Sequence, residues 1–360
     1  MLHRYILILA MLLPVGVSAM EWPSASWLWE SDELLSVGKS HVSLTHQSRS
    51  ADQRLNQNGD PEFMGRSSRQ RSERDGRTFI REFKVKIDYE RWTPSWAYGL
   101  SRNWTFMAQL PLTKIKSNIS ESIRAEGNVR VDASALTEAR QSMKADTGVQ
   151  IAEAGEYSNT RVGRFELRSK HRVYAKKSIT ATMFETLKFP TLEKTQVDFV
   201  AYPDPLPRNF GAGLGFLMSA RMTRQLGLVL SSQYLYQFED EVYGRKDDGM
   251  PTEDLVSRKP GAEVLSKLGA EFNPSEHLNL STGYSFQSKD ADEYFSNDVQ
   301  ETQAAKKHSV YVNLAYLPGL HTTKRQGQSG FSAALGYESL LSGENVEDSD
   351  TVSVEMQMTF

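Results

Sequence analysis

The chain contains no cysteine among its 360 residues. Disulfides therefore contribute nothing to its stability, and the fold must be held by sheet closure or core burial. Beyond the N-terminal region no run of about 18 apolar residues occurs, which excludes a bundle of membrane-spanning helices. The mean hydropathy is −0.50. That value is compatible with a membrane β-barrel, because barrel strands place only alternate residues in lipid.

Strong charge and catalytic motifs are also missing. The net charge is −3, which indicates no general affinity for nucleic acid. No cluster has the spacing of a zinc site, and no glycine-rich phosphate loop is present. We therefore expect no cofactor, no bound metal, no nucleic-acid partner and no enzymatic activity.

The N-terminus has the features of a secretory signal peptide. His3 and Arg4 precede an apolar run from Tyr5 to Leu13, and Val17-Ser18-Ala19 matches a small-x-small cleavage site. A membrane-anchoring helix is the alternative, but the run is short for a bilayer. We expect residues 1–19 to be removed, 20–34 to form a periplasmic segment or plug, and 35–360 to form one barrel.

The last ten residues alternate strictly between apolar and polar. Val352, Val354, Met356, Met358 and Phe360 share one face, whereas the odd positions are polar. Side chains alternate across a strand, so this segment has one apolar and one wet face. It resembles the closing strand of bacterial outer-membrane barrels, in which the terminal aromatic residue is read by the barrel-assembly machinery. The resemblance implies that Phe360 is an assembly signal.

The same period of two recurs along the chain as pairs of strands joined by short turns. Long polar connections separate these pairs, at 49–78, 117–160, 191–207, 242–260, 288–305 and 341–350. Alternating short and long connections are typical of a barrel with periplasmic turns and extracellular loops. The sequence predicts an all-β fold: a single transmembrane antiparallel barrel of about twelve strands, located in the bacterial outer membrane of a Gram-negative cell.

Three local features refine this prediction. The apolar phase changes from odd positions in 79–89 to even positions in 96–100, so we expect a bulge near Pro94. Trp96, Tyr98 and Trp104 flank one short turn, where they would lie at the membrane boundary or form an ordinary aromatic cluster. Residues 132–144 are rich in helix formers and could be a helix at the pore mouth or a surface segment.

If apolar parity marks lipid, the opposite parity marks a lumen. This places charged side chains of three strands inside, because charges facing lipid are costly. The pore-lining candidates are Glu82, Lys84, Lys86, Asp88, Glu90, Arg164, Glu166, Arg168, Lys170, Arg172, Glu263, Lys267 and Glu271. The ladder Arg168, Lys170 and Arg172 would favour anions. Alternatively, these cations pair with the carboxylates and fill the interior.

Two further patterns bear on the pore. Gly211, Gly213 and Gly215 share the inward parity of one strand, where they leave room for a solute or a plug, or else assist curvature. Arginine recurs through the first long connection, where it would contact lipopolysaccharide phosphates or simply remain solvated. The arginines concerned are Arg66, Arg69, Arg71, Arg74, Arg77 and Arg81.

Three fragments carry a resemblance to a known family: Tyr98 to Phe106 with Leu110-Pro111, Leu187 to Thr191, and Phe210 to Tyr234. They resemble the barrels of the MetA-pathway phenol-degradation family, which are related in style to long-chain fatty-acid transporters. Pro190-Thr191-Leu192 departs from the family's Pro-Thr-Gly. The resemblance implies passage of small, often hydrophobic molecules.

The main functional hypothesis is therefore an outer-membrane channel or facilitated transporter for small solutes. One alternative is a surface barrel whose long loops bind a partner. A less favoured one is an outer-membrane lipid hydrolase, suggested by His41-Val42-Ser43 and by the reversed Ser169-Lys170-His171. The charged lumen favours polar or anionic solutes, whereas the family resemblance favours apolar ones.

Overall fold

The computed structural model describes residues 34–71, 78–126, 155–176, 178–191, 209–245, 251–275, 277–296, 302–316 and 330–360. The signal peptide, nearly all of the segment 20–34 and the expected helix at 132–144 lie outside these residues. In the part of the chain that the structure describes, no helix is long and apolar enough to cross a membrane. The described residues form strands, turns and loops.

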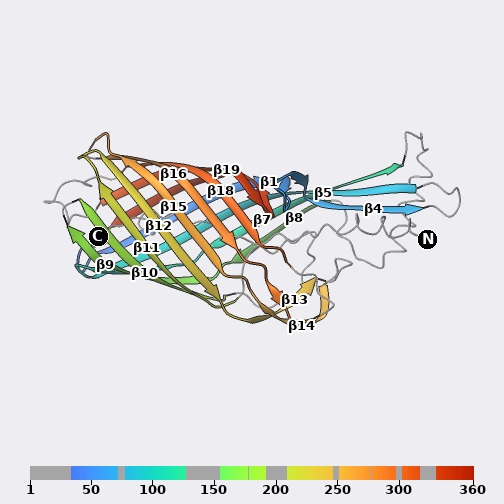
Figure 1. The fold of residues 1–360 in the computed structure, drawn as a ribbon, viewed down its shortest axis with the longest axis horizontal. Coiled ribbons are helices and arrows are strands. Elements are labelled where there is room, and N and C mark those ends of the chain that lie inside the picture. The colour runs from blue at the N-terminus through green and yellow to red at the C-terminus, as the bar shows by residue number, and fades with distance from the viewer. Residues whose placement is uncertain are drawn as a thin grey trace.

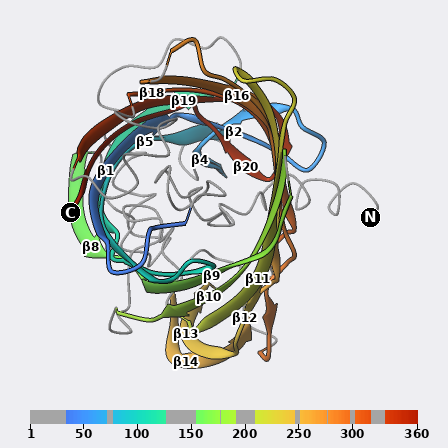
Figure 2. The same ribbon diagram turned by 90° about the vertical axis from the view of Figure 1, so that its left-hand side faces the viewer.

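Twelve strands run round a closed wall, as Figure 2 shows from one end. In wall order they are β1 (Ser40–Ala51), β21 (Thr351–Thr359), β19 (Gly330–Glu344), β18 (Ala305–Tyr316), β16 (Leu278–Lys289), β15 (Glu263–Phe272), β12 (Leu226–Gln237), β11 (Gly211–Arg221), β10 (Ile179–Phe189), β9 (Phe165–Lys176), β6 (Trp104–Gln109) and β5 (Thr78–Ser101). All pairs are antiparallel.

The wall closes because β1 pairs on both edges. His41 is opposite Thr359 of β21 on one side and opposite Ala97 of β5 on the other. Closure removes the free sheet edges that an open sheet would expose. The predicted all-β barrel of about twelve strands is confirmed.

The wall strands are amphipathic in the expected sense. On the terminal strand Val354 and Met356 are exposed on the outside, whereas Glu355 and Gln357 are buried inside. On β11 the outer face carries Leu214, Phe216 and Met218, also exposed. Such an apolar outer surface, with polar residues inside, is the arrangement of a barrel that crosses lipid.

The predicted short turns join β5 to β6, β9 to β10, β11 to β12 and β15 to β16. The predicted long connections contain additional strands: β2 (Gln53–Leu55), β3 (Pro61–Phe63), β4 (Gly65–Arg71), β13 (Asp240–Arg245), β14 (Pro251–Lys259), β17 (Glu293–Tyr294) and β20 (Val346–Asp348). Two more, β7 (Leu112–Ala125) and β8 (Gly155–Val162), continue β6 and lead into β9. The 117–160 connection is thus strand at both its ends, which corrects the prediction.

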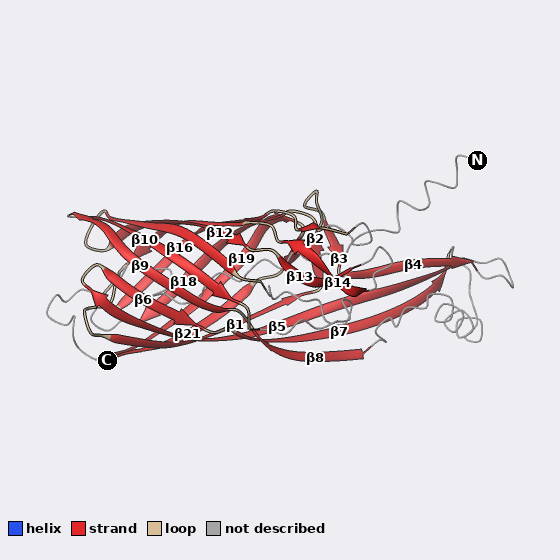
Figure 3. Ribbon diagram, turned by 90° about the horizontal axis from the view of Figure 1, so that it is seen from below, coloured by secondary structure: helices blue, strands red, loops and turns tan. Residues whose placement is uncertain are grey.

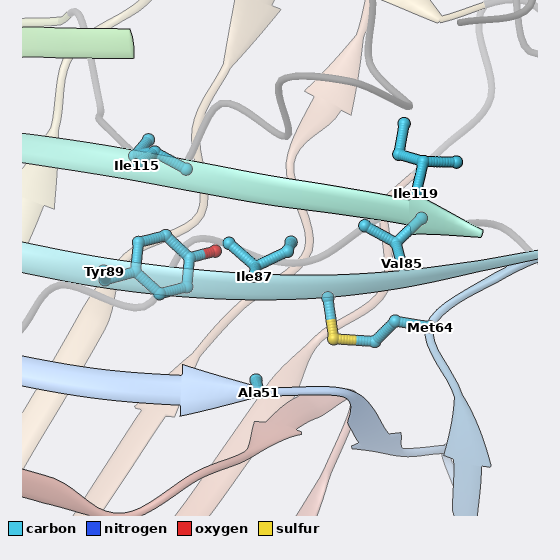
Figure 4. Packing of buried hydrophobic residues seen from close by; sticks show 7 residues of the cluster. All are labelled: Ala51, Met64, Val85, Ile87, Tyr89, Ile115 and Ile119. Carbon is cyan, nitrogen blue, oxygen red and sulfur yellow. The ribbon is translucent and has the colours of Figure 1, made fainter. Parts of the chain in front are cut away.

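One side of the wall extends well beyond the rest. Figures 1 and 3 show β4, β5 and β7 projecting from the end opposite the short turns. The inner face of this extension is apolar: Ala51, Met64, Val85, Ile87, Tyr89, Ile115 and Ile119 form one buried cluster, drawn in Figure 4.

The extension explains why the lumen prediction for β5 is wrong. Glu82, Lys84, Lys86, Asp88 and Glu90 lie on its outer face, because Val85, Ile87 and Tyr89 occupy the inner one. On this outer face Lys116 of β7 donates to Glu90 at 2.9 Å. That hydrogen bond lowers the pKa of the Glu90 carboxyl below its ordinary value. Since charges that face lipid are costly, we infer that this part of β5 stands outside the apolar band.

The expected bulge near Pro94 is also absent from β5. Its pairing with β1 runs without a shift from Tyr98 to Ile87. An irregularity lies elsewhere: β6 sets Gln109 against Glu166, whereas β7 sets Leu112 against Val162. One extra residue is therefore accommodated at Gly163–Arg164, beside Pro111.

Candidate lumen site

The interior is lined by buried polar side chains from most of the wall strands. Those of β1 are His41, Ser43, Thr45 and Gln47, all less than 5% exposed. Arg164, just before β9, and Glu166, Arg168 and Lys170 on β9 are buried as well, and Arg172 is half-buried. Glu263 is buried on β15, and Lys267 and Glu271 are half-buried. Whether any of these residues governs passage of a solute stays a prediction.

The charged residues of β9 are bonded to their neighbours. Gln109 donates to Glu166 at 2.8 Å, and the Lys188 ammonium lies 3.7 Å from the same carboxylate. Arg168 donates to Thr186 at 3.1 Å and to Gln233 at 3.2 Å. This bonding favours the alternative in which the lumen charges pair and fill the interior, over an open cationic ladder.

The three glycines of β11 leave room for side chains of neighbouring strands. A Cβ at Gly215 would come within 3.0 Å of the Phe184 ring, and one at Gly213 would crowd Gln233 and Leu235. Phe184 fills the space beside Gly215, and the Arg168 guanidinium lies 4.4 Å from the centre of its ring. The glycines thus accommodate side chains of β10 and β12 in this region.

A second polar network lies at the end of the barrel opposite the short turns. Arg164 donates to Gln237 at 3.3 Å, and Gln237 donates to Glu263 at 2.7 Å. Lys289 pairs with Asp292 at 3.1 Å.

Asp292 also links the wall to the β13–β14 hairpin. Arg258 of β14 lies 3.5 Å from Asp292 and donates twice to Asp240, at 3.0 and 2.7 Å. Burial opposes the charge of Arg258, but its hydrogen bonds to Asp240 prevail and raise its pKa.

A cavity of about 110 Å³ lies on the inner side of the wall. It is lined by β12, β15, β16, β18, β19, β21 and β1. Small residues make the space, among them Ala315, Ala334 and Gly336. Tyr311 lies flat against Gly269 and Gly283, where a Cβ would come within 3.0 Å of its hydroxyl. The ionisable lining, Tyr311 and Tyr337 aside, is Lys267, Glu271, Glu338 and Glu355.

Sequence reasoning identified Lys267 and Glu271 but missed Glu338 and Glu355. The signal was present for Glu355, since it occupies a polar odd position in the alternating terminal strand. Which inward residues share one cavity depends on the pairing register of the seven strands that line it, and the sequence does not contain that information directly.

Neither His–Ser pair has the arrangement of a hydrolase triad. His41 bonds Thr359 at 3.0 Å, and Ser43 bonds Ser95 at 2.5 Å. On the outer face, Ser169 Oγ lies 2.8 Å and Glu185 Oε2 3.3 Å from the same nitrogen of His171. In a triad the serine and the acid contact different ring nitrogens of the histidine. In the described part of the chain, no group of acidic or histidine residues could hold a metal ion.

The structure does not describe the side chains of the arginines that were predicted to contact lipopolysaccharide. Arg74 and Arg77 lie outside the described residues, and the side chains of Arg66, Arg69, Arg71 and Arg81 are not described. Trp96 and Trp104 are exposed on the outer face near the short turn, as expected.

No family model matches the chain, and no curated protein matches it. Among solved structures, an outer membrane channel of the COG4313 type from Pseudomonas putida F1 has a TM-score of 0.60 at 13% identity, covering 94% of this chain and 100% of that one. The monoaromatic hydrocarbon channel CymD has a TM-score of 0.38 at 13% identity, covering 90% and 88%. The transport unit of the autotransporter AIDA-I from Escherichia coli has a TM-score of 0.41 at 8% identity, covering 99% and 97%. The chain has the fold of an outer-membrane β-barrel.

Proposed function

We propose that this chain is a channel of the bacterial outer membrane through which small polar solutes pass. One observation carries the proposal: a closed barrel with an apolar outer surface encloses a polar interior that contains a cavity. Twelve strands give a lumen between the filled interior of small barrels and the open pore of large ones. The fold similarity to a COG4313 outer membrane channel supports it.

The lumen chemistry favours polar solutes over the hydrophobic ones that the family resemblance implies. The inner wall presents serine, threonine, glutamine, lysine and glutamate side chains, which an apolar solute would have to desolvate. Polar solutes would replace those hydrogen bonds instead. The bonding of Arg168 to Thr186 and Gln233 also argues for a narrow path with few mobile charges.

Liposome swelling with the purified, folded protein tests the proposal. Vesicles carrying the barrel should swell in small sugars and amino acids at rates that fall steeply with solute size. Planar-bilayer recordings should show small, discrete conductance steps. A barrel that migrates as folded on gels yet gives neither swelling nor current would overturn the proposal.

Surface binding is a second candidate, favoured by the extension of β4, β5 and β7. A projecting sheet with a charged outer face offers a partner more area than a short loop. Deleting residues 127–154, between β7 and β8, separates the two candidates. Altered conductance with unchanged cell attachment favours channel gating, and the reverse favours adhesion.

Two further partners belong to the same proposal. Phe360 exchanges backbone hydrogen bonds with Ser40 at 3.0 and 2.9 Å, so the last residue lies at the seam of the closed wall. Its position suits a residue read during assembly by the barrel-assembly machinery. Lipopolysaccharide would be bound by arginines of the first long connection, through bidentate contacts with phosphates.

A further inference from the structure

We infer that two copies of this chain associate side by side in the membrane through a polar patch on the outer face of the barrel. The patch consists of Trp104 on β6, Ser169 and His171 on β9, and Glu185 on β10. The inference goes beyond the proposed function, because it concerns the outside of the barrel and does not depend on passage of a solute.

Glu185 projects from the apolar outer face of β10. Its neighbours along this face, Met183 and Leu187, are 47% and 40% exposed, and the Glu185 side chain is 46% exposed. Among the carboxylates on the wall strands that the structure describes, Glu185 is the one with apolar side chains on both sides of it along the outer face. An ionisable group that faces hydrocarbon is costly, which indicates that a partner covers it.

The patch is held together by its own hydrogen bonds. Trp104 Nε1 donates to Ser169 Oγ at 2.7 Å, and that oxygen lies 2.8 Å from His171 Nε2. Glu185 Oε2 lies 3.3 Å from the same ring nitrogen. The rings of Trp104 and His171 stack with their centres 5.1 Å apart. The imidazole and the carboxylate are therefore held in fixed positions on the outer face.

These contacts leave one polar atom on each ionisable side chain for a partner. The polar contacts of His171 are made through Nε2, and that of Glu185 through Oε2. Within the described residues, His171 Nδ1 and Glu185 Oε1 have no hydrogen-bond or ion-pair partner. Both side chains are more than a third exposed, so a neighbouring molecule can reach these atoms.

The position of the patch selects a protein as that neighbour. Beside Met183 and Leu187 the lipid offers hydrocarbon and no hydrogen-bonding group. A two-fold axis would bring the same patch against itself, so that residues of one copy meet those of the other twice. The Glu185 carboxylate of one copy would then accept from the His171 imidazole of the other. A patch that contains both an acid and a base meets this requirement for self-complementarity, which makes a second copy the partner that fits.

The shape of the barrel agrees with a contact of this width. The strands β10, β9 and β6 are consecutive in the wall, and Figure 3 shows them side by side. Two barrels that lie side by side touch along a narrow strip, because both surfaces are convex. Apolar side chains of the same three strands, Leu187, Leu167 and Phe106, extend the strip beyond the polar patch.

Disulfide cross-linking in native outer membranes tests the inference, since the chain has no cysteine of its own. Met183 is directly opposite His171 in the pairing of β10 with β9. Under a mild oxidant, Met183→Cys should give a species of twice the mass of the chain. The matched control is Leu268→Cys on β15, which is also exposed on the outer face and should stay monomeric.

A second measurement isolates the contribution of the carboxylate. Sedimentation equilibrium of the folded protein in density-matched detergent should show a dimer. Glu185→Gln should raise its dissociation constant roughly tenfold or more, because two symmetric charge-assisted hydrogen bonds are lost. Glu90→Gln, on the outer face of the extension, should leave the dissociation constant unchanged. In the Met183→Cys background, Glu185→Gln should reduce cross-linking.

The remaining outcomes contradict the inference. Equal cross-linking of Met183→Cys and Leu268→Cys would indicate random collisions, and a product of any other mass would identify a different partner. A dimer that Glu185→Gln leaves intact would exclude the patch as its contact. Where detergent separates the copies, or where heat-modifiable migration shows that Glu185→Gln does not fold, the two cysteine variants in membranes decide. Absence of a cross-link in Met183→Cys then overturns the inference.

Discussion

Gly211, Gly213 and Gly215 follow one another on the inner face of β11, yet their surroundings differ. A Cβ at Gly215 would come within 3.0 Å of both the Phe184 ring and the Ser232 carbonyl, whereas the nearest atom at Gly211 is 3.4 Å away. Gly215→Ala should therefore lower the free energy of unfolding by about 1–3 kcal/mol through overpacking. Gly211→Ala is the matched control and should stay within about 0.5 kcal/mol. Urea unfolding in lipid vesicles measures both, and equal effects would contradict this account.

Arg168 makes a second test at the scale of one side chain. It spans from β9 to Gln233 on β12 and covers Phe184 on the way. Arg168→Ala removes two charge-assisted hydrogen bonds, each contributing about 1.5–3 kcal/mol, and empties part of the lumen. We expect lower resistance to urea together with larger single-channel conductance. Arg172→Ala, at a half-buried position four residues further along this face, should show smaller changes in both. An unchanged conductance in Arg168→Ala would place this side chain outside the solute path.

At the scale of the strand, β5 shows where reading parity from a sequence fails. The rule that apolar side chains face lipid holds only inside the membrane. On the extension of β5 the same alternation packs Val85, Ile87 and Tyr89 against Met64 and Ile115, as Figure 4 shows. The charged candidates from Glu82 to Glu90 therefore face outward. By contrast, on the terminal strand β21 the apolar residues are exposed and the polar residues are buried, and on β9 Glu166, Arg168 and Lys170 are buried while Val173 is exposed.

This reversal predicts a difference between two adjacent residues. Ile87 is 1% exposed, whereas the Lys86 side chain is 56% exposed. Ile87→Ala should cost about 2–5 kcal/mol, most of it local to the extension. Lys86→Ala should cost less than about 0.5 kcal/mol. Hydrogen exchange on β5 and β7 measures the local effect. A larger loss of protection in Lys86→Ala than in Ile87→Ala would support the sequence prediction that Lys86 faces the lumen.

The whole molecule adds what no single strand reveals. The number of strands and the alternation of turns follow from period and connection length, so the barrel was predictable. The cavity was not, because it arises where small residues of β18 and β19 leave a gap that β15, β16 and β21 surround. That arrangement depends on stagger round the closed wall, and a one-residue slip in any pair would dismantle it.

The absence of cysteine allows the orientation of the whole barrel to be tested with single reporter thiols. Lys86→Cys lies on the extension, Leu214→Cys on the exposed apolar face of β11, and Arg224→Cys in the short turn after β11. A membrane-impermeant maleimide should label Lys86→Cys on intact cells and Arg224→Cys only after the outer membrane is permeabilised. Leu214→Cys should resist the reagent, and a spin label there should report lipid. Labelling of Arg224→Cys on intact cells would indicate the reverse orientation of the barrel. Aqueous labelling at all three positions would contradict its location in the membrane.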